Sequence, residues 1–397
     1  MAKTLDDIRV LDFGRAVAGP FCTMLLKDLG AEVIKVEIPD GGDAPRNTPP
    51  LTQGLEGGLF INLNRGKKGI TLNLASERGL QITKDLAKQV DVVVENFSPG
   101  VMDRLGLGCE ELSKLNSGLI YASLSGYGHT GPRHSGLAYN IIVQAMGGLI
   151  SVNGFPGDPP LRIPVAIGDY LAGFYTALAI VSALHHRSKT GEGQEIDISM
   201  QDAVWAITAM EHAPTYFLNN EIPQRTGNAF IGNAPDLIQP AKDGYVVIAS
   251  HTVGQWESLL RAMGREDLIG VPKYSTQVER VKRRDEVNAL VQEYTKTKRV
   301  DEIVDELTRV RVPSSPIPSF DQVANDPQLL SRDMIIEVEQ AISGKVKVPG
   351  SVFKMSKTPG DVKFPAPFLG EHNYEVYYKM LGYSEQEVRK LADEGVI

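Results

Sequence analysis

Cysteine is scarce in this 397-residue chain, which has only Cys22 and Cys109. The two form no pair with the spacing of metal ligands, so the sequence supports neither a disulfide framework nor a zinc site, and no metal is expected. The N-terminal residues 1–7 also lack the apolar region of a secretory signal. These absences together indicate a cytoplasmic protein.

Long hydrophobic runs are lacking as well. The apolar run Leu171–Leu184 is shorter than the roughly 20 residues that span a bilayer, so it is interpreted as a buried helix and no window reaches transmembrane length. Positive charge is not in excess, because the net charge is −8, and this argues against a nucleic-acid or anionic-membrane surface. An anionic ligand would need a local basic pocket. Candidate cations, each with surface solvation as the alternative, are Arg15, Lys35, Arg46, Arg65, Lys67, Lys68 and Arg104.

The common nucleotide-binding motifs are missing too. No GxGxxG follows the first expected strand and no GxxxxGK[ST] occurs, so a dinucleotide-dependent dehydrogenase or a P-loop enzyme is poorly supported. What is present is an alternation of apolar strands with helices. Strands are expected at residues 8–13, 31–36, 70–74, 91–94, 119–124 and 194–199, with helices at 20–29, 76–89 and 201–218. This alternation predicts an α/β fold with a parallel sheet covered on both faces.

Ligands of such sheets bind beyond the carboxyl ends of the strands. Those ends carry Gly14-Arg15, Asn96-Phe97 and the glycine-rich stretch Ser125–Gly128. A further candidate is Asp169, where a loop turns into the helix that contains the apolar run. A helix N-terminus favours an anion and keeps a carboxylate ionised, although an ordinary N-cap aspartate is the alternative interpretation.

A change of composition predicts the domain organisation. From Pro223 the chain becomes rich in asparagine, glycine and proline, and a new strand and several charged helices follow. We expect residues 1–222 to form the first part of a large domain, residues 223–326 a smaller inserted domain, and residues 327–397 a return to the large domain.

A series of short motifs runs along nearly the whole chain. They are Val10–Phe13, Ala18–Pro20, Leu29–Glu37, Asn64–Lys68, Val94–Gly100, Gly126–Pro132, Gln144–Gly148, Ile167–Asp169, Lys189–Gln194 and Leu369–His372. In this order they resemble the class III CoA-transferases, the family of formyl-CoA transferase, carnitine CoA-transferase and α-methylacyl-CoA racemase. The resemblance implies a Rossmann-like large domain, a smaller α+β domain and two chains threaded through each other as an interlocked dimer.

Asp169 matches the catalytic aspartate of that family. The resemblance implies that its carboxylate attacks an acyl-CoA thioester, giving a mixed anhydride and the CoA thiolate, before the acceptor acid becomes the new thioester. CoA thioester is then a substrate, and no permanently bound cofactor is expected. The anhydride must be shielded from water, which a helix start beside an apolar run can provide.

The resemblance also implies which residues bind CoA, because they stand at the positions of CoA-binding residues in the family. Asn96, Phe97 and Arg104 match family residues near the nucleotide part of CoA, with Phe97 as an apolar wall for adenine or, alternatively, a core residue. Less specific partners for the phosphates are Lys35, Arg65, Lys67 and Lys68. Ile38 and Leu137 stand where some members have an arginine and a lysine, so these two CoA contacts are in doubt.

The acid site departs from that of formyl-CoA:oxalate enzymes. Val17 replaces their glutamine, and their tetraglycine loop is absent, which favours an acid larger than oxalate or formate. Arg15 could pair the second carboxylate of a dicarboxylic acid such as succinate, and the Tyr139 hydroxyl could orient a carboxylate, unless it is a buried structural tyrosine. The sequence therefore predicts an acyl-CoA:carboxylate CoA-transferase for a dicarboxylic or substituted succinic-type acid, with succinyl-CoA as donor.

Two alternatives stay open. The racemases of the family use a histidine in a Gly-His-Asp segment as a second base, but Ala138-Tyr139-Asn140 aligns with that segment here, and His129 and His134 are displaced from it. The chain could also be the catalytic subunit of a hetero-oligomer with a related chain, although a homodimer is expected.

Overall fold

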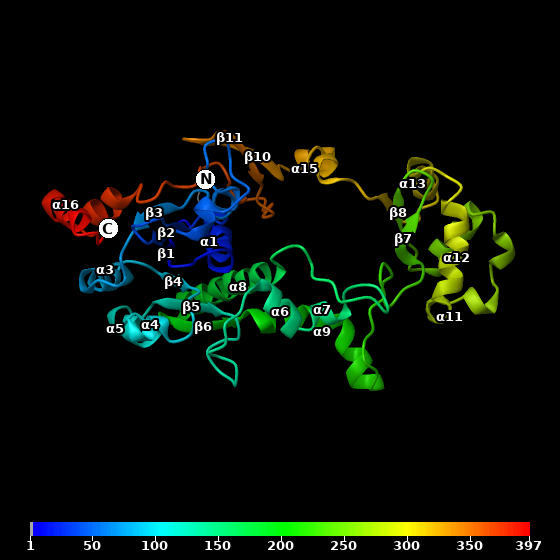
Figure 1. The fold of residues 1–397 in the computed structure, drawn as a ribbon, viewed down its shortest axis with the longest axis horizontal. Coiled ribbons are helices and arrows are strands. Elements are labelled where there is room, and N and C mark those ends of the chain that lie inside the picture. Colours follow the sequence, from blue (N-terminus) through cyan, green and yellow to red (C-terminus); the bar gives the residue numbers. More distant parts are fainter. Residues whose placement is uncertain (1–2) are drawn as a thin grey trace. The chain divides into compact units, whose positions relative to one another are not determined.

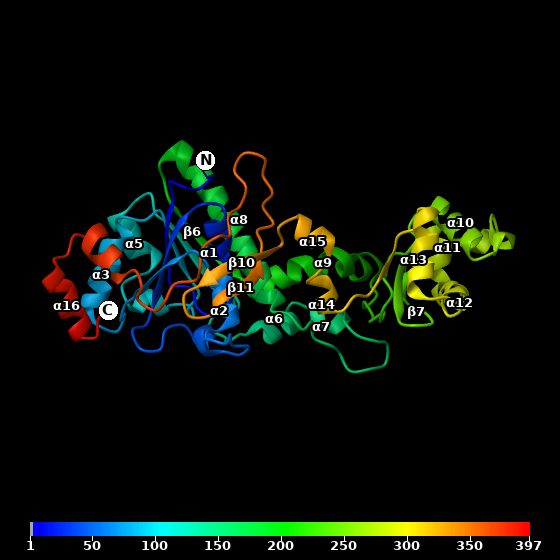
Figure 2. The same cartoon turned by 90° about the horizontal axis from the view of Figure 1, so that it is seen from above.

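Six parallel strands form the central sheet of the structure, a computed structural model that describes residues 3–397 (Figures 1 and 2). The strands are β1 (Arg9–Asp12), β2 (Glu32–Glu37), β3 (Lys68–Thr71), β4 (Val92–Glu95), β5 (Ile120–Ser125) and β6 (Gln194–Ser199), and they lie in the order β3-β2-β1-β4-β5-β6. This is the order of a doubly wound sheet, whose winding reverses between β1 and β4. The α/β class with a parallel sheet, expected from the sequence, is confirmed.

Helices cover both faces of this sheet. Helices α1 (Ala18–Asp28) and α8 (Ile167–Thr190) supply apolar side chains to a core that includes Val10 of β1. Helices α3 (Glu77–Ala87), α5 (Cys109–Leu115) and α16 (Glu385–Asp393) supply a second core that includes Leu11. Successive residues of β1 enter different cores because side chains alternate along a strand.

Helix α8 is longer than the sequence indicated. Its 24 residues are long and apolar enough to span a membrane by length and composition, so the expectation that no segment reaches this length is wrong. The helix contacts α1, α9 (Met200–Asn219) and strands β5 and β6, as a core helix of a layered protein does. Helix α1 approaches it closely at Gly173, where a Cβ atom would lie 2.6 Å from the carbonyl oxygen of Ala18.

The chain divides into two compact units. The first comprises the residues up to 149 together with 162–221 and 327–397. Besides the sheet and its helices it contains the two-stranded antiparallel sheet of β10 (Ile335–Gln340) and β11 (Gly344–Pro349). Its shorter elements are α2 (Gly58–Asn64), α4 (Val101–Arg104), α6 (Asn140–Met146), α15 (Pro327–Ser331), a 3-10 turn (Ala44–Asn47) and a π-helix (Tyr374–Met380).

The second unit comprises residues 150–161 and 222–326, with α7 (Leu149–Val152) at its border. It contains an antiparallel sheet in the order β7-β8-β9, and its core includes Trp256 and Ile303. Its elements are β7 (Asp236–Pro240), β8 (Tyr245–Ala249), β9 (Ser314–Pro316), α10 (Val253–Ala262), α11 (Gln277–Lys282), α12 (Arg284–Thr295), α13 (Val300–Arg309), α14 (Phe320–Val323) and 3-10 turns at Glu266–Leu268 and Pro272–Tyr274. The division into a large domain of residues 1–222 and 327–397 and an inserted smaller domain of residues 223–326 stays a prediction.

Candidate active site

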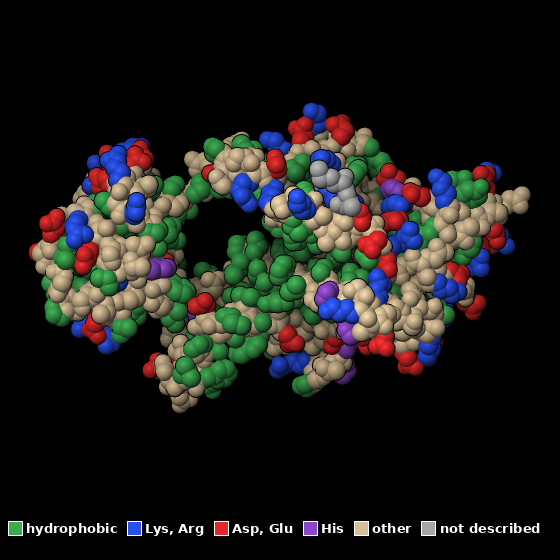
Figure 3. All heavy atoms as spheres, turned by 180° about the vertical axis from the view of Figure 1, so that it is seen from behind, with side chains coloured by type: hydrophobic (Ala, Val, Ile, Leu, Met, Phe, Trp, Pro, Cys, Tyr) green, Lys and Arg blue, Asp and Glu red, His purple; other side chains and the backbone are tan. Residues whose placement is uncertain are grey.

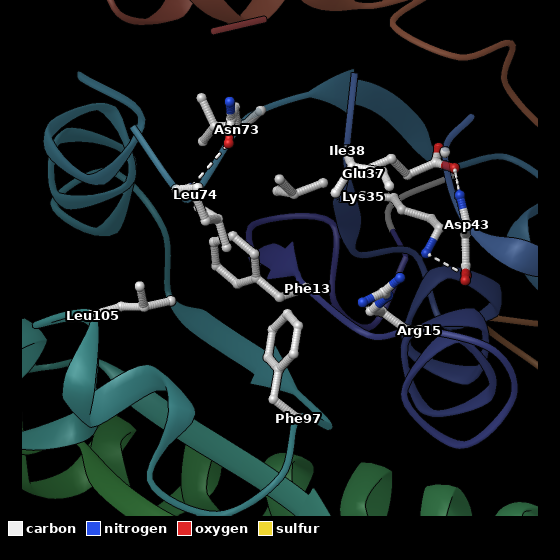
Figure 4. A pocket seen from close by; sticks show the side chains of 14 residues that line it. Phe13, Arg15, Lys35, Glu37, Ile38, Asp43, Asn73, Leu74, Phe97 and Leu105 are labelled. Atoms are coloured by element: carbon white, nitrogen blue, oxygen red, sulfur yellow. Dashed lines mark hydrogen bonds and ion pairs between the residues drawn. The ribbon is translucent and has the colours of Figure 1, made fainter. Parts of the chain in front are cut away.

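Two cavities of the first unit lie beyond the carboxyl ends of β1 and β4, where the winding of the sheet reverses. The Asp169 cavity has a volume of about 390 Å³ and is lined by residues 15–16, 96–99, 124–126 and 136–139 together with Asp169 and Met200. The Phe13 cavity has a volume of about 290 Å³ and is lined by Phe13, Arg15, Phe97, Leu105 and residues 35–38, 42–43 and 72–75 (Figure 4). Arg15 and Phe97 line both, so the two cavities share a wall. This is the place where open α/β sheets bind their ligands.

Asp169 lies in the first turn of α8. It is the third residue of that helix, and Ala166 occupies the N-cap position, so the alternative interpretation of Asp169 as an N-cap is wrong. Burial raises the pKa of Asp169 from 3.8 to about 6, and a hydrogen bond from its own amide only partly opposes this. Burial therefore disfavours the charged form of this carboxyl group, an effect that the sequence did not indicate. The carboxylate is still about nine-tenths ionised at pH 7.

Two amide side chains of α6 fix the segment that leads into α8. Asn140 Oδ1 accepts a hydrogen bond from the amide of Gly168 at 3.0 Å, and Asn140 Nδ2 donates to the carbonyl of Val165 at 3.2 Å. Gln144 is fully buried, and its side chain bonds both the amide and the carbonyl of Ile163. The backbone on the N-terminal side of Asp169 is thus held by α6. Neither side chain was assigned a role from the sequence, although Gln144 lies within a family motif and Asn140 lies close to one.

The structure brings Arg15, Asn96, Phe97 and Tyr139 together with Asp169 in the Asp169 cavity. Arg15 is the only cation among the residues that line it. Tyr139 is 81% exposed, so the alternative of a buried structural tyrosine is wrong. Asn96 contacts protein backbone in this structure: its side chain accepts from the amide of Arg15 at 2.7 Å and donates to the carbonyl of Arg15 at 3.0 Å.

The Phe13 cavity is mainly apolar. The rings of Phe13 and Phe97 lie toward one another in its wall, with Leu74 and Leu105 nearby (Figure 4). Residues 72–75, which follow β3, were not singled out from the sequence. Their position after the carboxyl end of β3 is the feature of the sequence that could have identified them as ligand-binding residues. Ile38 lines this cavity and is 47% exposed, so the replacement for an arginine presents an apolar side chain there.

Three other predicted residues either do not line a cavity or have no free charge there. Val17 immediately precedes α1 and packs partly buried against the core rather than lining either cavity. Arg104, at the end of α4, is exposed and next to Leu105. Lys35 lines the Phe13 cavity but is fully buried in an ion pair with Asp43.

The structure does not bring three further basic residues to either cavity. Arg65 is buried against Asp28 at 2.9 Å, and Lys67 is buried against Asp12 at 3.0 Å. Lys68 pairs with Glu32 and Glu375. Each of these cations already has an internal carboxylate partner, so this geometry gives no support to the phosphate contacts predicted for them.

Comparison with known proteins agrees with the motifs. The model of CoA-transferase family III matches residues 5–373. Succinyl-CoA–D-citramalate CoA-transferase of Chloroflexus aurantiacus is 38% identical over 100% of this chain and 98% of its own length. Succinyl-CoA:mesaconate CoA-transferase of Haloarcula marismortui is 37% identical over 94% of this chain and 95% of its own length. A solved structure, a CaiB/BaiF family protein from Brucella suis, has a TM-score of 0.84 and 35% identity over 96% of this chain and 100% of that chain. The chain therefore belongs to CoA-transferase family III and is a class III CoA-transferase.

Proposed function

We propose that this enzyme transfers CoA between carboxylic acids through covalent intermediates on Asp169. The carboxylate attacks the thioester carbonyl of the donor, forming an aspartyl mixed anhydride and releasing the CoA thiolate. The thiolate attacks the aspartyl carbonyl, giving an aspartyl-CoA thioester and the free donor acid. The acceptor carboxylate then attacks this thioester, forming a second anhydride, and the thiolate released attacks the acceptor's acyl carbon. Asp169 is regenerated as a carboxylate, and no net proton is consumed.

The observation that carries this proposal is the environment of Asp169. The side chain lines a cavity, forms no ion pair with the residues that the structure describes, and has a pKa raised by burial to about 6. A carboxylate that is ionised at neutral pH but poorly solvated is a better nucleophile than an exposed one, and a partly closed site protects an anhydride from hydrolysis.

We place CoA across the shared wall of the two cavities. The apolar Phe13 cavity suits the adenine ring, which Phe97 can contact face-on. Arg104 is exposed close by and suits a phosphate, while the pantetheine arm passes Arg15 and Phe97 toward Asp169. CoA is substrate in this scheme, and no permanent cofactor is required.

We propose a dicarboxylic or substituted succinic-type acid as the acceptor and succinyl-CoA as a donor. Arg15 lines the Asp169 cavity, and within the described chain its guanidinium has no ion-pair partner, so it is available to a second carboxylate. The two curated relatives named above are, by their names, enzymes that use succinyl-CoA with citramalate or mesaconate. Tyr139, exposed at the same cavity, is suited to donate a hydrogen bond to a substrate carboxylate.

The racemase alternative gains no support from the cavity. Its second base would need to face Asp169, yet no histidine is among the residues that line the Asp169 cavity. Asn140, at the position of the aspartate in Gly-His-Asp, is engaged with the backbone of Gly168 and Val165. The acid–base pair required for α-proton transfer is not assembled by these residues.

We further propose that the enzyme is a homodimer of the cytoplasm. Large apolar side chains are exposed on α9 and on the adjoining α8 and α6, including Met210 (74%), Phe217 (68%) and Leu218 (82%) (Figure 3). A patch of this kind marks an interface, and a second copy of the chain is the simplest partner. Static light scattering at micromolar concentration tests this: twice the 43.3 kDa chain mass is expected, whereas a monomer that gains activity only with a related chain would favour the hetero-oligomer.

The decisive test of the proposed function is intact-mass spectrometry after mixing with succinyl-CoA. We expect a CoA or succinyl adduct that hydroxylamine converts to a hydroxamate at Asp169. The matched control is Asp202, the third residue of α9 and an exposed carboxylate at the same helical position. Asp202→Ala should keep the adduct and the transfer activity, and Asp169→Ala should lose both. Transfer by Asp169→Ala at the parent rate would refute the nucleophile. Exchange of the α-proton into deuterated water without any adduct would instead indicate the racemase.

A further inference from the structure

The loop Gly14–Ala16 connects β1 to α1 and forms part of the wall of the Asp169 cavity. Each of its three amides donates to a side chain rather than to backbone. The Gly14 amide donates to Asp12 Oδ1 at 2.8 Å, and the Arg15 amide donates to Asn96 Oδ1 at 2.7 Å. The Ala16 amide donates to both oxygens of Asp43, at 3.1 and 3.2 Å.

The carbonyls of the loop are held in the same way. Lys35 Nζ donates to the carbonyl of Gly14 at 2.7 Å, and Asn96 Nδ2 donates to that of Arg15 at 3.0 Å. Ala16 has a φ of 58°, in the left-handed region that a residue with a Cβ rarely occupies. Such a conformation persists only where the surroundings over-determine it, and it is typical of functional sites.

Lys35 and Asp43 form the inner part of this support. Their ion pair measures 3.1 Å, with side chains 0% and 3% exposed (Figure 4). Asp43 is itself anchored, because its amide donates to Glu37 Oε2 at 2.9 Å, and Glu37 forms a bidentate ion pair with Arg46 at 2.7 and 2.8 Å. The pair therefore fixes the backbone on both sides of Arg15, through the Gly14 carbonyl and the Ala16 amide. Neither residue lines the Asp169 cavity, and their two charges neutralise each other.

We infer that Asp43, together with Lys35, is a positioning residue that aims Arg15 at the second carboxylate of the acid substrate. This replaces the phosphate role that the sequence suggested for Lys35, and it rests on the proposed function. A planar guanidinium binds a carboxylate well only when its direction is fixed, and the loop backbone sets that direction. If the loop loses its hydrogen bonds to Asp43, Arg15 is still present, but its guanidinium is no longer held in the direction of the substrate carboxylate.

The test compares two five-carbon acceptors, glutarate with two carboxylates and valerate with one. In ping-pong kinetics kcat/KM for the acceptor reports only its own half-reaction, so one donor serves both. Lys35→Met/Asp43→Leu removes both buried charges together and leaves neither unpaired. We expect the glutarate-to-valerate ratio of kcat/KM to fall at least tenfold in this variant and in Arg15→Met, and no further when the two are combined. Asp43→Asn keeps an acceptor for the Ala16 amide and should retain the ratio within about threefold.

The matched control is a second ion pair of the same unit at the amino end of β4. Arg187 Nη2 lies 2.9 Å from Asp91 Oδ1, away from both cavities. Asp91→Leu/Arg187→Met should leave the acceptor ratio unchanged. Hydrogen exchange of the peptide that contains residues 14–17 gives a readout independent of activity: it should accelerate at least tenfold in Lys35→Met/Asp43→Leu and not in the control.

The outcomes separate the two claims. Unchanged exchange in Lys35→Met/Asp43→Leu overturns the positioning role whatever the enzyme transfers. A ratio that falls equally in the Asp91 control, or adds to the loss from Arg15→Met, also overturns it, because the effect would then be general or independent of Arg15. Accelerated exchange with no change of ratio in Arg15→Met refutes instead the carboxylate role of Arg15 in the proposed function.

Discussion

Asp169 should make the folded enzyme less stable than it could be. Its pKa in the folded protein is about 6, above the ordinary value of 3.8, because burial disfavours the charged form. A carboxyl group with a raised folded pKa binds its proton more tightly in the folded state, so it destabilises the protein at high pH and this penalty disappears as pH falls. Asp169→Asn replaces the carboxylate by an amide of the same shape without a charge and should therefore increase stability at neutral pH.

The magnitude follows from the two pKa values. Above pH 6 the penalty is complete and amounts to about 3 kcal/mol. At pH 5 the folded protein has taken up most of its proton and about half of the penalty is left. Below the unfolded pKa of 3.8 both states are protonated and the penalty is zero.

Urea unfolding at one protein concentration measures this directly. The free energy of unfolding of Asp169→Asn should exceed that of the parent at pH 7.5 by up to about 3 kcal/mol, with roughly half that gain at pH 5, while transfer activity is lost. Asp202→Asn is the control: it removes an exposed carboxylate from the first turn of α9 and should cost up to about 1 kcal/mol through the helix dipole. A parent protein that is as stable as Asp169→Asn at pH 7.5, or a gain that grows toward pH 5, would refute the account of a poorly solvated carboxylate.

Three further predictions concern the site and its support. The value of kcat/KM for acyl-CoA should fall about tenfold per pH unit below pH 6 as Asp169 takes up its proton; a flat profile between pH 5 and 7 would contradict this. Phe97→Ala should weaken CoA binding, measured by calorimetry, by about 5- to 150-fold, since base stacking on an aromatic ring contributes about 1–3 kcal/mol. Lys67→Met should lower the free energy of unfolding by about 3–5 kcal/mol, because it leaves buried Asp12 without its cation. If Lys67 binds phosphate instead, CoA affinity would drop and stability would not.

The central sheet was predictable because its signal is local. Each strand is a short apolar run, and strand β6 occupies the residues expected for it, 194–199. Helix α8 was underestimated because the expectation followed only its apolar stretch. Arg187 and Lys189 in its last turn are charged yet continue the helix to Thr190. The pair β10 and β11 was missed although Val346 and Val348 alternate with lysines, a pattern typical of a strand with one buried face. The core in which this pair packs includes Phe60 and Ile61 of α2, which lie far away in the sequence.

The residues of the Asp169 cavity were partly predictable, since Arg15, Asn96 and Phe97 follow expected strands. The charged residues were harder to interpret. From the sequence, Lys35, Arg65 and Lys67 were candidates for binding phosphate. In the structure each forms an ion pair with a buried carboxylate of the same chain. The partners in these ion pairs are 8 to 55 residues apart in the sequence. Which of them meet depends on which strands become neighbours in the sheet, and this cannot be predicted from composition.

The wall shared by the two cavities has a consequence for how such an enzyme can acquire new acids. Arg15 and Phe97 line both cavities, so under the proposed placement of CoA a substitution of either residue would change nucleotide binding and acid selection together. Segment 136–139 contributes to the Asp169 cavity alone, and Leu137 there is 83% exposed. Under the proposed placement of CoA, substitutions at Ala138 or Tyr139 of that segment would therefore change the acid site and leave the Phe13 cavity as it is. Leu137 is different, because the family resemblance places a CoA contact at its position.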